Sequence, residues 1–282
     1  MLSISHVINP FISPSRQDLD AIQPLVCESM RYARDFCSDN ITVDLCGTIF
    51  SEDASCFPEG FRRLPNLYRS ILDVYPFTTQ KKLPLIHDIL NIACQNSKAD
   101  YMVYTNMDII VMPHFYRLID SYIRDGFDTM IINRRDIECS ENNNLSTLPK
   151  IWSAIGQPSA GYDCFVFARK KYTTFTKDMC CIGAAAVDMG IVANMMVAAN
   201  KLAFLSEEHV TCHIGNDRQW IHEEFDELTT HNYREFSKVY PALRDTLTEK
   251  YMPDHSIMER MQVISSEVFP EYIVQHRNKN AS

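Results

Sequence analysis

Apolar and polar residues follow two alternating periods along the first 130 positions of the chain. Short runs rich in β-branched residues are separated by longer segments whose apolar residues recur at helical spacing. We expect strands at residues 4–8, 41–50, 101–105 and 128–133, and helices at 17–36, 83–96 and 112–125. This alternation predicts an α/β fold with a mainly parallel central sheet and helices on both of its faces.

Two prolines modify the first two helical patterns. Pro24 lies inside the first pattern, where we expect it to shift the start of the helix. Pro84 suits the first turn of the second helix, because that position needs no backbone N–H.

The second half of the chain is less regular. Residues 136–160 have a polar, loop-like centre, 162–170 form a strand pattern and 185–200 a helix pattern rich in Ala and Met. Residues 201–215 predict a short strand followed by a loop that carries His213. Residues 217–275 look helical, with breaks near Pro241, Pro253 and Pro270. We therefore expect one catalytic or binding domain at 1–215 and a helical C-terminal extension at 216–282 packed on it.

Composition limits the classes of partner. The 282 residues suffice for one large domain or two small ones, and the net charge of −9 argues against nucleic acid as a partner. The N-terminal residues show no signal-peptide pattern, and no apolar run approaches the roughly 20 residues that span a bilayer. We expect a cytoplasmic protein, with peripheral membrane association left open and the oligomeric state undetermined. The ten cysteines form no CxxC pair, so reduced thiols are expected.

The stretch "ADYMVYTNMDIIVMP" places a single carboxylate, Asp108, just beyond a predicted buried strand. In open parallel sheets, ligands bind beyond the carboxyl ends of the strands. A carboxylate at this place is a hard oxygen ligand that suits Mg²⁺ or Mn²⁺, and such an ion would neutralise a bound diphosphate. Alternatively, Asp108 only caps the following turn by accepting backbone hydrogen bonds.

The same stretch resembles the metal-binding segment of GT-A-type glycosyltransferases, which use nucleotide-diphospho-sugar donors. In that family a strand ends in Asp-x-Asp or a variant, and here Asn106-Met107-Asp108 occupies those positions. The resemblance covers residues 4–215 and implies a GT-A-like (Rossmann-like) sheet. It implies that Asp108 binds Mn²⁺ or Mg²⁺, while Asn106, a weaker ligand, contacts the donor sugar or ribose.

The resemblance also implies further donor-binding residues upstream. Lys81 or Lys82 would meet the diphosphate, Asp88 would lie near the nucleoside, and Asn9 would bind the base or ribose. The alternative for the lysines is a solvated pair before a helix, and for Asn9 a simple Asn-Pro turn.

A late histidine completes the metal site in many members of the family. His213 in "SEEHVTCHIGNDRQW" resembles that ligand, with His209 as the alternative, and imidazole is a suitable donor for Mn²⁺. The competing interpretation is a loop histidine bonded to backbone carbonyls.

The resemblance places the general base at the start of a late helix. Inverting members carry an acid there that deprotonates the acceptor hydroxyl, which makes Asp188 in "CIGAAAVDMGIV" the candidate. An acid at a helix N-terminus also stabilises the helix dipole without any catalytic role. Glu207, Glu208 and Asp217 are reserve candidates, and Asp163 is a candidate for binding an acceptor hydroxyl.

These residues together predict a metal-dependent glycosyltransferase that moves a sugar from a nucleotide-diphosphate donor to a hydroxyl of a glycan or small molecule. A nucleotidyltransferase is the second hypothesis, but "INPFISPSRQDL" lacks the Gly-rich loop that usually follows the first strand of those enzymes. The third is a nucleotide- or glycan-binding module without turnover, which the neutral Asn106 keeps open.

Overall fold

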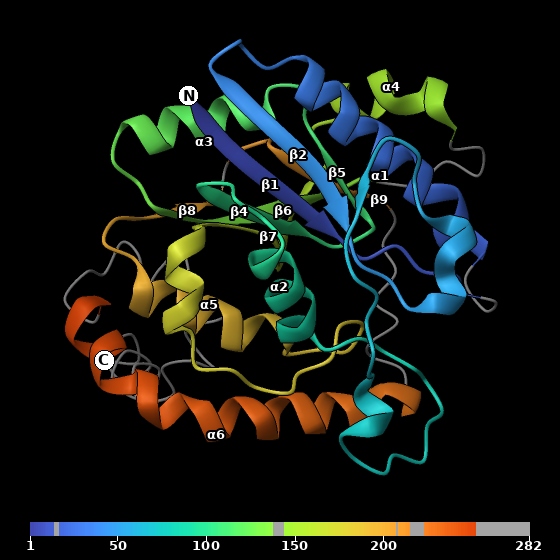
Figure 1. Cartoon of the computed structure of the whole chain (residues 1–282), viewed down its shortest axis with the longest axis vertical. Coiled ribbons are helices and arrows are strands. Elements are labelled where there is room, and N and C mark those ends of the chain that lie inside the picture. Colours follow the sequence, from blue (N-terminus) through green and yellow to red (C-terminus); the bar gives the residue numbers. More distant parts are fainter. Residues whose placement is uncertain (14–16, 138–143, 207, 215–222, 252–282) are drawn as a thin grey trace, which may run out of the picture.

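Nine strands of the described residues pair into one mixed sheet (Figure 1). The structure is a computed structural model that describes residues 1–13, 17–137, 144–206, 208–214 and 223–251. The strand order is β3-β2-β1-β4-β7-β6-β9-β5, and β8 pairs with β6 outside this path. The strands are β1 Leu2–Ile8, β2 Ile41–Gly47, β3 Arg62–Arg63, β4 Tyr101–Thr105, β5 Ile109–Val111, β6 Thr129–Ile137, β7 Gln157–Ala168, β8 Leu202–Leu205 and β9 Thr211–Ile214. Five of the eight strand pairings are parallel, which confirms the predicted mainly parallel α/β sheet.

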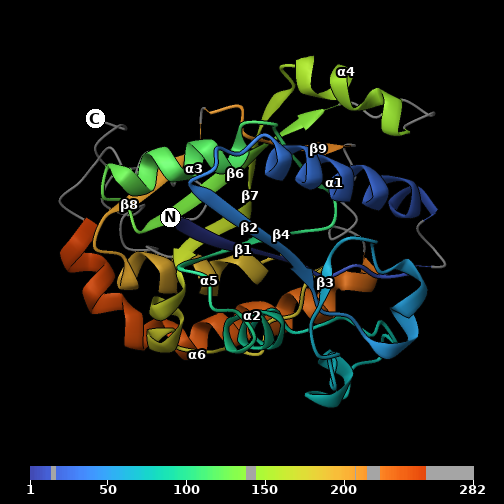
Figure 2. The ribbon, with the colours of Figure 1, turned by 45° about the horizontal axis from the view of Figure 1, so that its top comes forward.

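Helices cover both faces of the sheet (Figure 2). On one face lie α1 Gln17–Asp35, α3 Phe115–Arg124 and α4 Leu148–Ser153, and on the other α2 Ile86–Gln95, α5 Val187–Ala198 and α6 Asp226–Tyr251. Short 3₁₀ segments connect these elements: η1 Ser51–Cys56, η2 Ile71–Asp73, η3 Leu145–Thr147, η4 Arg169–Thr174 and η6 Glu223–Phe225. None of the helices in the described part of the chain combines the length and apolarity needed to cross a bilayer.

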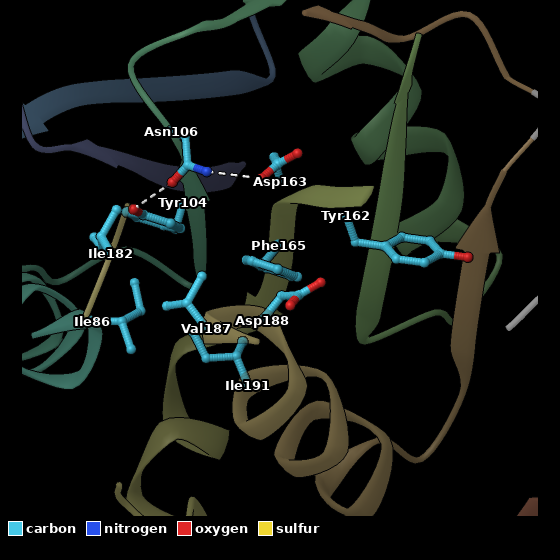
Figure 3. A pocket seen from close by; sticks show the side chains of 10 residues that line it. All are labelled: Ile86, Tyr104, Asn106, Tyr162, Asp163, Phe165, Ile182, Val187, Asp188 and Ile191. Atoms are coloured by element: carbon cyan, nitrogen blue, oxygen red, sulfur yellow. Dashed lines mark hydrogen bonds between the residues drawn. The ribbon is translucent and has the colours of Figure 1, made fainter. Parts of the chain in front are cut away.

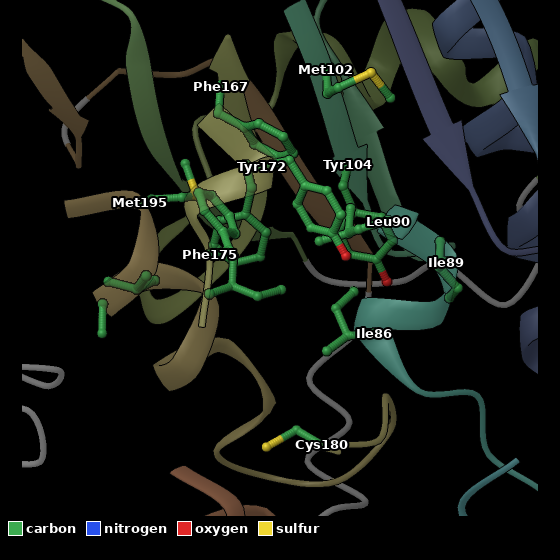
Figure 4. Packing of buried hydrophobic residues seen from close by; sticks show 14 of the residues in the cluster. Ile86, Ile89, Leu90, Met102, Tyr104, Phe167, Tyr172, Phe175, Cys180 and Met195 are labelled. Atoms are coloured by element: carbon green, nitrogen blue, oxygen red, sulfur yellow. The ribbon is translucent and has the colours of Figure 1, made fainter. Parts of the chain in front are cut away.

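Each face of the sheet has its own apolar core. On the α2, α5 and α6 side, Met102 and Phe167 of the sheet pack with Ile89 and Met195 of the helices (Figure 4). On the opposite side, Ile4 packs with residues of α1 and α3. Burying one such side chain stabilises the fold by about 1.5–3 kcal/mol, so the two cores fix the sheet on which the candidate site stands.

Prolines interrupt the helices less than we expected. Pro24 and Pro241 both lie inside continuous helices, and α2 begins at Ile86, so Pro84 precedes it. The predicted shift at Pro24, the break at Pro241 and the place of Pro84 were therefore wrong. An internal proline costs roughly 3 kcal/mol, and buried residues on both sides of it, such as Phe236 and Leu243 in α6, offset that loss.

One further expectation needs correction. His213 lies in strand β9, not in a loop, because the segment 211–214 fills a gap between β5 and β6. Around the polar, loop-like centre expected within 136–160, β6 extends to Ile137, α4 spans 148–153, and β7 begins at Gln157, while residues 138–143 lie outside the described part.

The C-terminal helix α6 packs against the rest of the structure. Val239 and Leu247 belong to the same core as α2 and α5, and the Tyr251 hydroxyl donates a hydrogen bond to the carbonyl of Met196, 2.8 Å away. The predicted boundary between 215 and 216, together with Pro253 and Pro270, lies outside the described residues, so the division of the chain at that boundary stays a prediction.

Candidate active site

Strand β9 brings the two predicted metal ligands together. His213 is the register partner of Ile109 on β5 and of Asp136 on β6. Asp108 immediately precedes β5, and its Oδ2 lies 3.5 Å from His213 Nε2. On the other side of the ring, His213 Nδ1 lies 3.2 Å from Asp136 Oδ1. Asp108 and His213 are therefore in contact, and their role as metal ligands stays a prediction.

Neighbouring groups balance the charges buried here. Burial alone would lower the pKa of His213, but the carboxylates of Asp108 and Asp136 outweigh burial and raise this pKa to about 9. Burial acts to raise the pKa of Asp108, yet His213 and Arg134 together hold it below the ordinary value of an aspartate. In the protein without ligand, Asp108 is thus ionised and His213 is an imidazolium at neutral pH.

The donor atoms at this place suit a divalent cation such as Mg²⁺ or Mn²⁺. Asp108 Oδ1 is buried without a hydrogen-bond partner among the described residues, so one hard oxygen ligand is left unsatisfied. His213 presents Nε2 beside it while Asp136 lies against the other ring nitrogen, an arrangement typical of metal-bound histidines.

These ligands alone would not enclose an ion. Within the described ranges, no group of three or more His, Cys, Asp or Glu side chains is placed to hold a metal. A cation shared with a diphosphate needs only one or two protein ligands, because phosphate oxygens and water supply the rest. Asp108 and His213 fit that requirement if His213 releases its proton on binding, as metal ligation demands.

Arg134, which our sequence analysis did not identify, is a cation of the protein itself beside this pair. It falls in an irregular stretch of β6 where the register with β7 shifts twice, a distortion common next to active sites. Its guanidinium pairs with Asp163 on β7, and its Nε lies 3.2 Å from Asp136 Oδ1. Burial would lower the pKa of Arg134, but Asp163, Asp108 and Asp136 raise it above the usual value. A permanent positive charge therefore lies among three carboxylates.

A sequence signal for Arg134 and Asp136 exists in the run "MIINRRDI". Charged residues that follow an apolar strand mark its carboxyl end, where a ligand site is expected. The predicted strand ends at residue 133, whereas β6 continues to Ile137, and the charged residues therefore lie outside the predicted site.

The side chain of Asn106 is held at both ends. The Tyr104 hydroxyl donates to Asn106 Oδ1, and Asn106 Nδ2 donates to Asp163 Oδ1, each at 2.8 Å. An aspartate at position 106 would place a second carboxylate against Asp163, and two such charges repel each other. The asparagine thus fits its neighbour, because its amide donates a hydrogen bond where a carboxylate has no donor.

A narrow hollow lies beside this network, with Asp188 at its border (Figure 3). Its cavity volume is only about 10 Å³, and its amide and carboxylate groups come from Asn106, Asp163 and Asp188. Asp188 stands in the first turn of α5, after Ala186, whose φ of 65° lies in the left-handed region. Strained backbone of this kind is often found at functional sites. Three candidate residues that are distant in the sequence therefore share one hollow.

Asn9 and Lys82 are engaged in local contacts and do not line the hollow. Asn9 Nδ2 donates to the carbonyl of Thr48 at 2.7 Å, which links the ends of β1 and β2. Lys82 forms an ion pair with Glu52, and both side chains are about half exposed. Their predicted contacts with the nucleotide stay predictions.

Asp88 and Lys81 also have protein partners. Asp88 accepts two hydrogen bonds from Arg69, at 2.7 and 2.9 Å, which is the bidentate geometry of a strong pair. Lys81 Nζ lies 3.2 Å from Glu224 Oε2. Asp88 therefore fixes Arg69 in this structure, and its predicted contact with a nucleoside stays a prediction.

The reserve candidates do not join the site where they are described. His209 Nε2 lies 3.4 Å from the sulfur of Cys212, and Glu208 accepts a hydrogen bond from a tyrosine hydroxyl of α3 at 3.4 Å. Glu207 and Asp217 lie outside the described residues.

Comparison with known proteins identifies the fold. No family model matches the sequence, and no curated protein matches it. The solved structure of S. aureus TarS 1-349 in complex with UDP-GlcNAc is similar, with a TM-score of 0.54, 8% identity and coverage of 95% of this chain and 73% of that one. TarS 1-349 in a second structure gives a TM-score of 0.53 at 7% identity, covering 97% and 73%.

A looser match is glucosyl-3-phosphoglycerate synthase from Mycobacterium tuberculosis in complex with Mn²⁺, UDP and phosphoglyceric acid. Its TM-score is 0.47 at 14% identity, with coverage of 85% of this chain and 78% of that one. At the identities of the two TarS matches, the likeness concerns the fold, and it confirms the predicted GT-A-like architecture.

Proposed function

We propose, on the premise of this GT-A fold, that the chain is a glycosyltransferase that depends on Mn²⁺ or Mg²⁺. It would move a sugar from a nucleotide-diphosphate donor to a hydroxyl of a glycan or small-molecule acceptor. The observation that carries the proposal is the contact between Asp108 and His213, with the unsatisfied Asp108 Oδ1 beside it. Such a pair of side chains beyond the end of a parallel strand is suited to share an ion with a diphosphate.

Asp108 and His213 would hold the cation, and Asp136 would keep the imidazole oriented. A bound divalent cation neutralises the diphosphate and stabilises it as a leaving group. Asn106, fixed by Tyr104 and Asp163, would direct its amide toward the donor sugar or ribose.

The nucleotide would contact Asn9, Lys82 and Asp88. Lys82 would exchange its ion pair with Glu52 for one with the diphosphate, an exchange that is easy for two half-exposed side chains. Asp88 would contribute through Arg69, which it already orients.

Asp188 would act as the general base. Its carboxylate borders the hollow next to Asn106, so an acceptor hydroxyl bound there would give its proton to Asp188 as its oxygen bonds to the donor sugar. The bond from the sugar to the diphosphate breaks in the same transfer, and the nucleotide leaves with that electron pair.

The test is donor turnover by the full chain beside the Asp108→Ala variant. Thermal-shift measurements with nucleoside diphosphates and Mn²⁺ first identify the donor class, because a ligand that binds only the folded state raises the melting temperature. Hydrolysis of the matching nucleotide sugar is then followed with and without EDTA. We expect metal-dependent release of nucleotide by the wild type and at least a hundredfold slower release by the variant. Equal release by both proteins would refute the role of Asp108.

A binding module without turnover remains the second candidate. The observation that favours it is that Asn106, Lys82 and Asp88 are all paired within the protein. In that case nucleotides with Mn²⁺ would raise the melting temperature, but neither protein would release nucleotide from any donor.

A further inference from the structure

A second hollow lies at the end of the sheet opposite the candidate active site. Its cavity volume is about 270 Å³, and its walls are residues 99–101 and 168–170. Tyr101 begins β4, Ala168 ends β7, and the two are register partners, so the second hollow forms where both chain segments meet the edge of the sheet. Asn106 follows the other end of β4, about 17 Å away for five residues of strand. The second hollow is therefore separate from the candidate active site.

Arg169 is held in a fixed orientation in the wall of the second hollow. Its backbone N–H donates to the carbonyl of Asp100, and its Nε donates to the carbonyl of Ala99, both at 2.8 Å. The Nη groups of Arg169 have no hydrogen-bond or ion-pair partner among the described residues. A guanidinium oriented in this way offers parallel N–H donors to a phosphate, and little side-chain entropy is lost on binding.

The two other charged residues of the lining differ in their surroundings. Lys170 is exposed, and within the described ranges its ammonium has no partner either. Asp100 Oδ2 accepts two hydrogen bonds from Ser3, at 2.6 Å from the hydroxyl and 3.1 Å from the backbone N–H. These bonds, helped by the charge of Arg169, hold the pKa of Asp100 below its ordinary value. The second hollow thus offers two unpaired cations and one carboxylate that is already bound on one side.

We propose that the second hollow binds a small sugar monophosphate. The phosphate accepts hydrogen bonds from Arg169 and Lys170, and a hydroxyl of the same molecule donates to Asp100. A bare anion makes no use of Asp100 and is repelled by its charge, whereas a hydroxyl turns this carboxylate into a favourable partner. The volume of about 270 Å³ lies just below the roughly 300–1,000 Å³ of pockets for drug-sized ligands, which suits one phosphorylated sugar ring.

The experiment is calorimetric titration of the full chain with glucose 6-phosphate and with ribose 5-phosphate. Glucose, ribose and inorganic phosphate are the matched probes, because each lacks either the phosphate or the sugar. Vesicles of phosphatidylcholine that contain phosphatidic acid, followed by sedimentation, distinguish a lipid headgroup from a soluble source of the phosphate group.

Two variants each remove one cation from the wall. These are Arg169→Gln and Lys170→Gln, and either one suffices if the other fails to fold. Arg234→Gln is the matched control, because Arg234 is an exposed arginine of α6 that does not line the second hollow. Circular dichroism and melting curves establish that each variant is folded.

We expect saturable binding of both sugar phosphates by the wild type, and about tenfold weaker binding or less by each folded hollow variant. Arg234→Gln should match the wild type, the free sugars should not bind, and inorganic phosphate should bind more weakly than either ester. The proposal is overturned if the wild type binds neither ester, if it binds inorganic phosphate as tightly, or if the hollow variants bind the esters unchanged. An equal loss in Arg234→Gln, or binding to vesicles without binding to either soluble ester, would also overturn it.

Discussion

Asn232 on α6 holds the loop that leads into Asp188, and its removal is the most informative stability test. Asn232 Oδ1 accepts from the N–H of Cys181 at 2.9 Å, and its Nδ2 donates to the carbonyls of Cys181 and Ala185, both at 3.0 Å. Asn232 and Cys181 are both fully buried. The Asn232 side chain thus forms the hydrogen bonds that a neighbouring strand would otherwise provide to the backbone of this loop.

Asn232→Ala would leave both peptide groups of Cys181 without these partners in a dry environment. A buried polar group that loses its partner costs about 1–3 kcal/mol, so the two groups together give a loss of about 2–6 kcal/mol. Domains are usually stable by only about 5–15 kcal/mol, so the variant should be markedly destabilised, with a large part of its stability gone.

The assay is urea unfolding of both proteins, followed by circular dichroism and intrinsic fluorescence so that the two-state assumption is tested. Ser237→Ala is the control on the same helix, since Ser237 is exposed and its hydroxyl donates a hydrogen bond to the carbonyl of Tyr233 one turn earlier. The control should stay within about 0.5 kcal/mol of the wild type. A loss below about 1 kcal/mol for Asn232→Ala would refute the reasoning, because it would mean that water or a shifted loop satisfies these groups.

Three further predictions concern backbone packing, pH and metal. Gly190→Ala should lower the free energy of unfolding more than Gly126→Ala in the same urea assay, because the Cβ added at Gly190 would overlap the buried carboxylate of Asp178. At Gly126 only the positive φ of 88° costs energy, about 1–2 kcal/mol. Equal losses of stability in the two variants would contradict this. Burial lowers the pKa of His6 to about 3 against 6.5 in the unfolded chain, so the unfolded state binds more protons between these values. The wild type therefore loses up to about 1.4 kcal/mol of stability per pH unit as the pH falls through this range. The stability of His6→Gln should rise relative to the wild type between pH 6.5 and 4, and parallel plots of stability against pH for the two proteins would count against this. Asp108→Asn should abolish the part of the nucleotide-induced thermal shift that requires Mn²⁺ while leaving the melting temperature without ligand within a few degrees; an unchanged Mn²⁺ effect would remove Asp108 from the ion site.

The sequence predicted the central elements because their patterns are local. The strand at 101–105 has the predicted bounds, since an apolar run that ends in Thr105-Asn106 needs no other part of the chain to be recognised. Strands β3 and β5 escaped prediction because they contain only two and three residues, fewer than any periodicity can reveal. Their pairing partners decide their conformation.

The candidate site shows the same contrast between residues that local patterns predict and residues that depend on distant contacts. Asp108 stood out as a lone acid, whereas Arg134 and Asp136 depend on an irregular strand whose length is set by β7 and β9. The neutral residue at position 106 also becomes understandable only once Asp163 is seen opposite it. Local patterns therefore located one candidate ligand, and tertiary contacts supplied the charged groups around it.

The position of β9 between β5 and β6 has a consequence for synthesis. Among the described strands β5 pairs with β9 alone, so it finds this partner only when residues 211–214 have been translated and inserted. Such a late, distant pairing slows folding. A nascent chain released before that point would carry Asp108 without His213, so the contact between these two side chains forms only after most of the sheet has been translated.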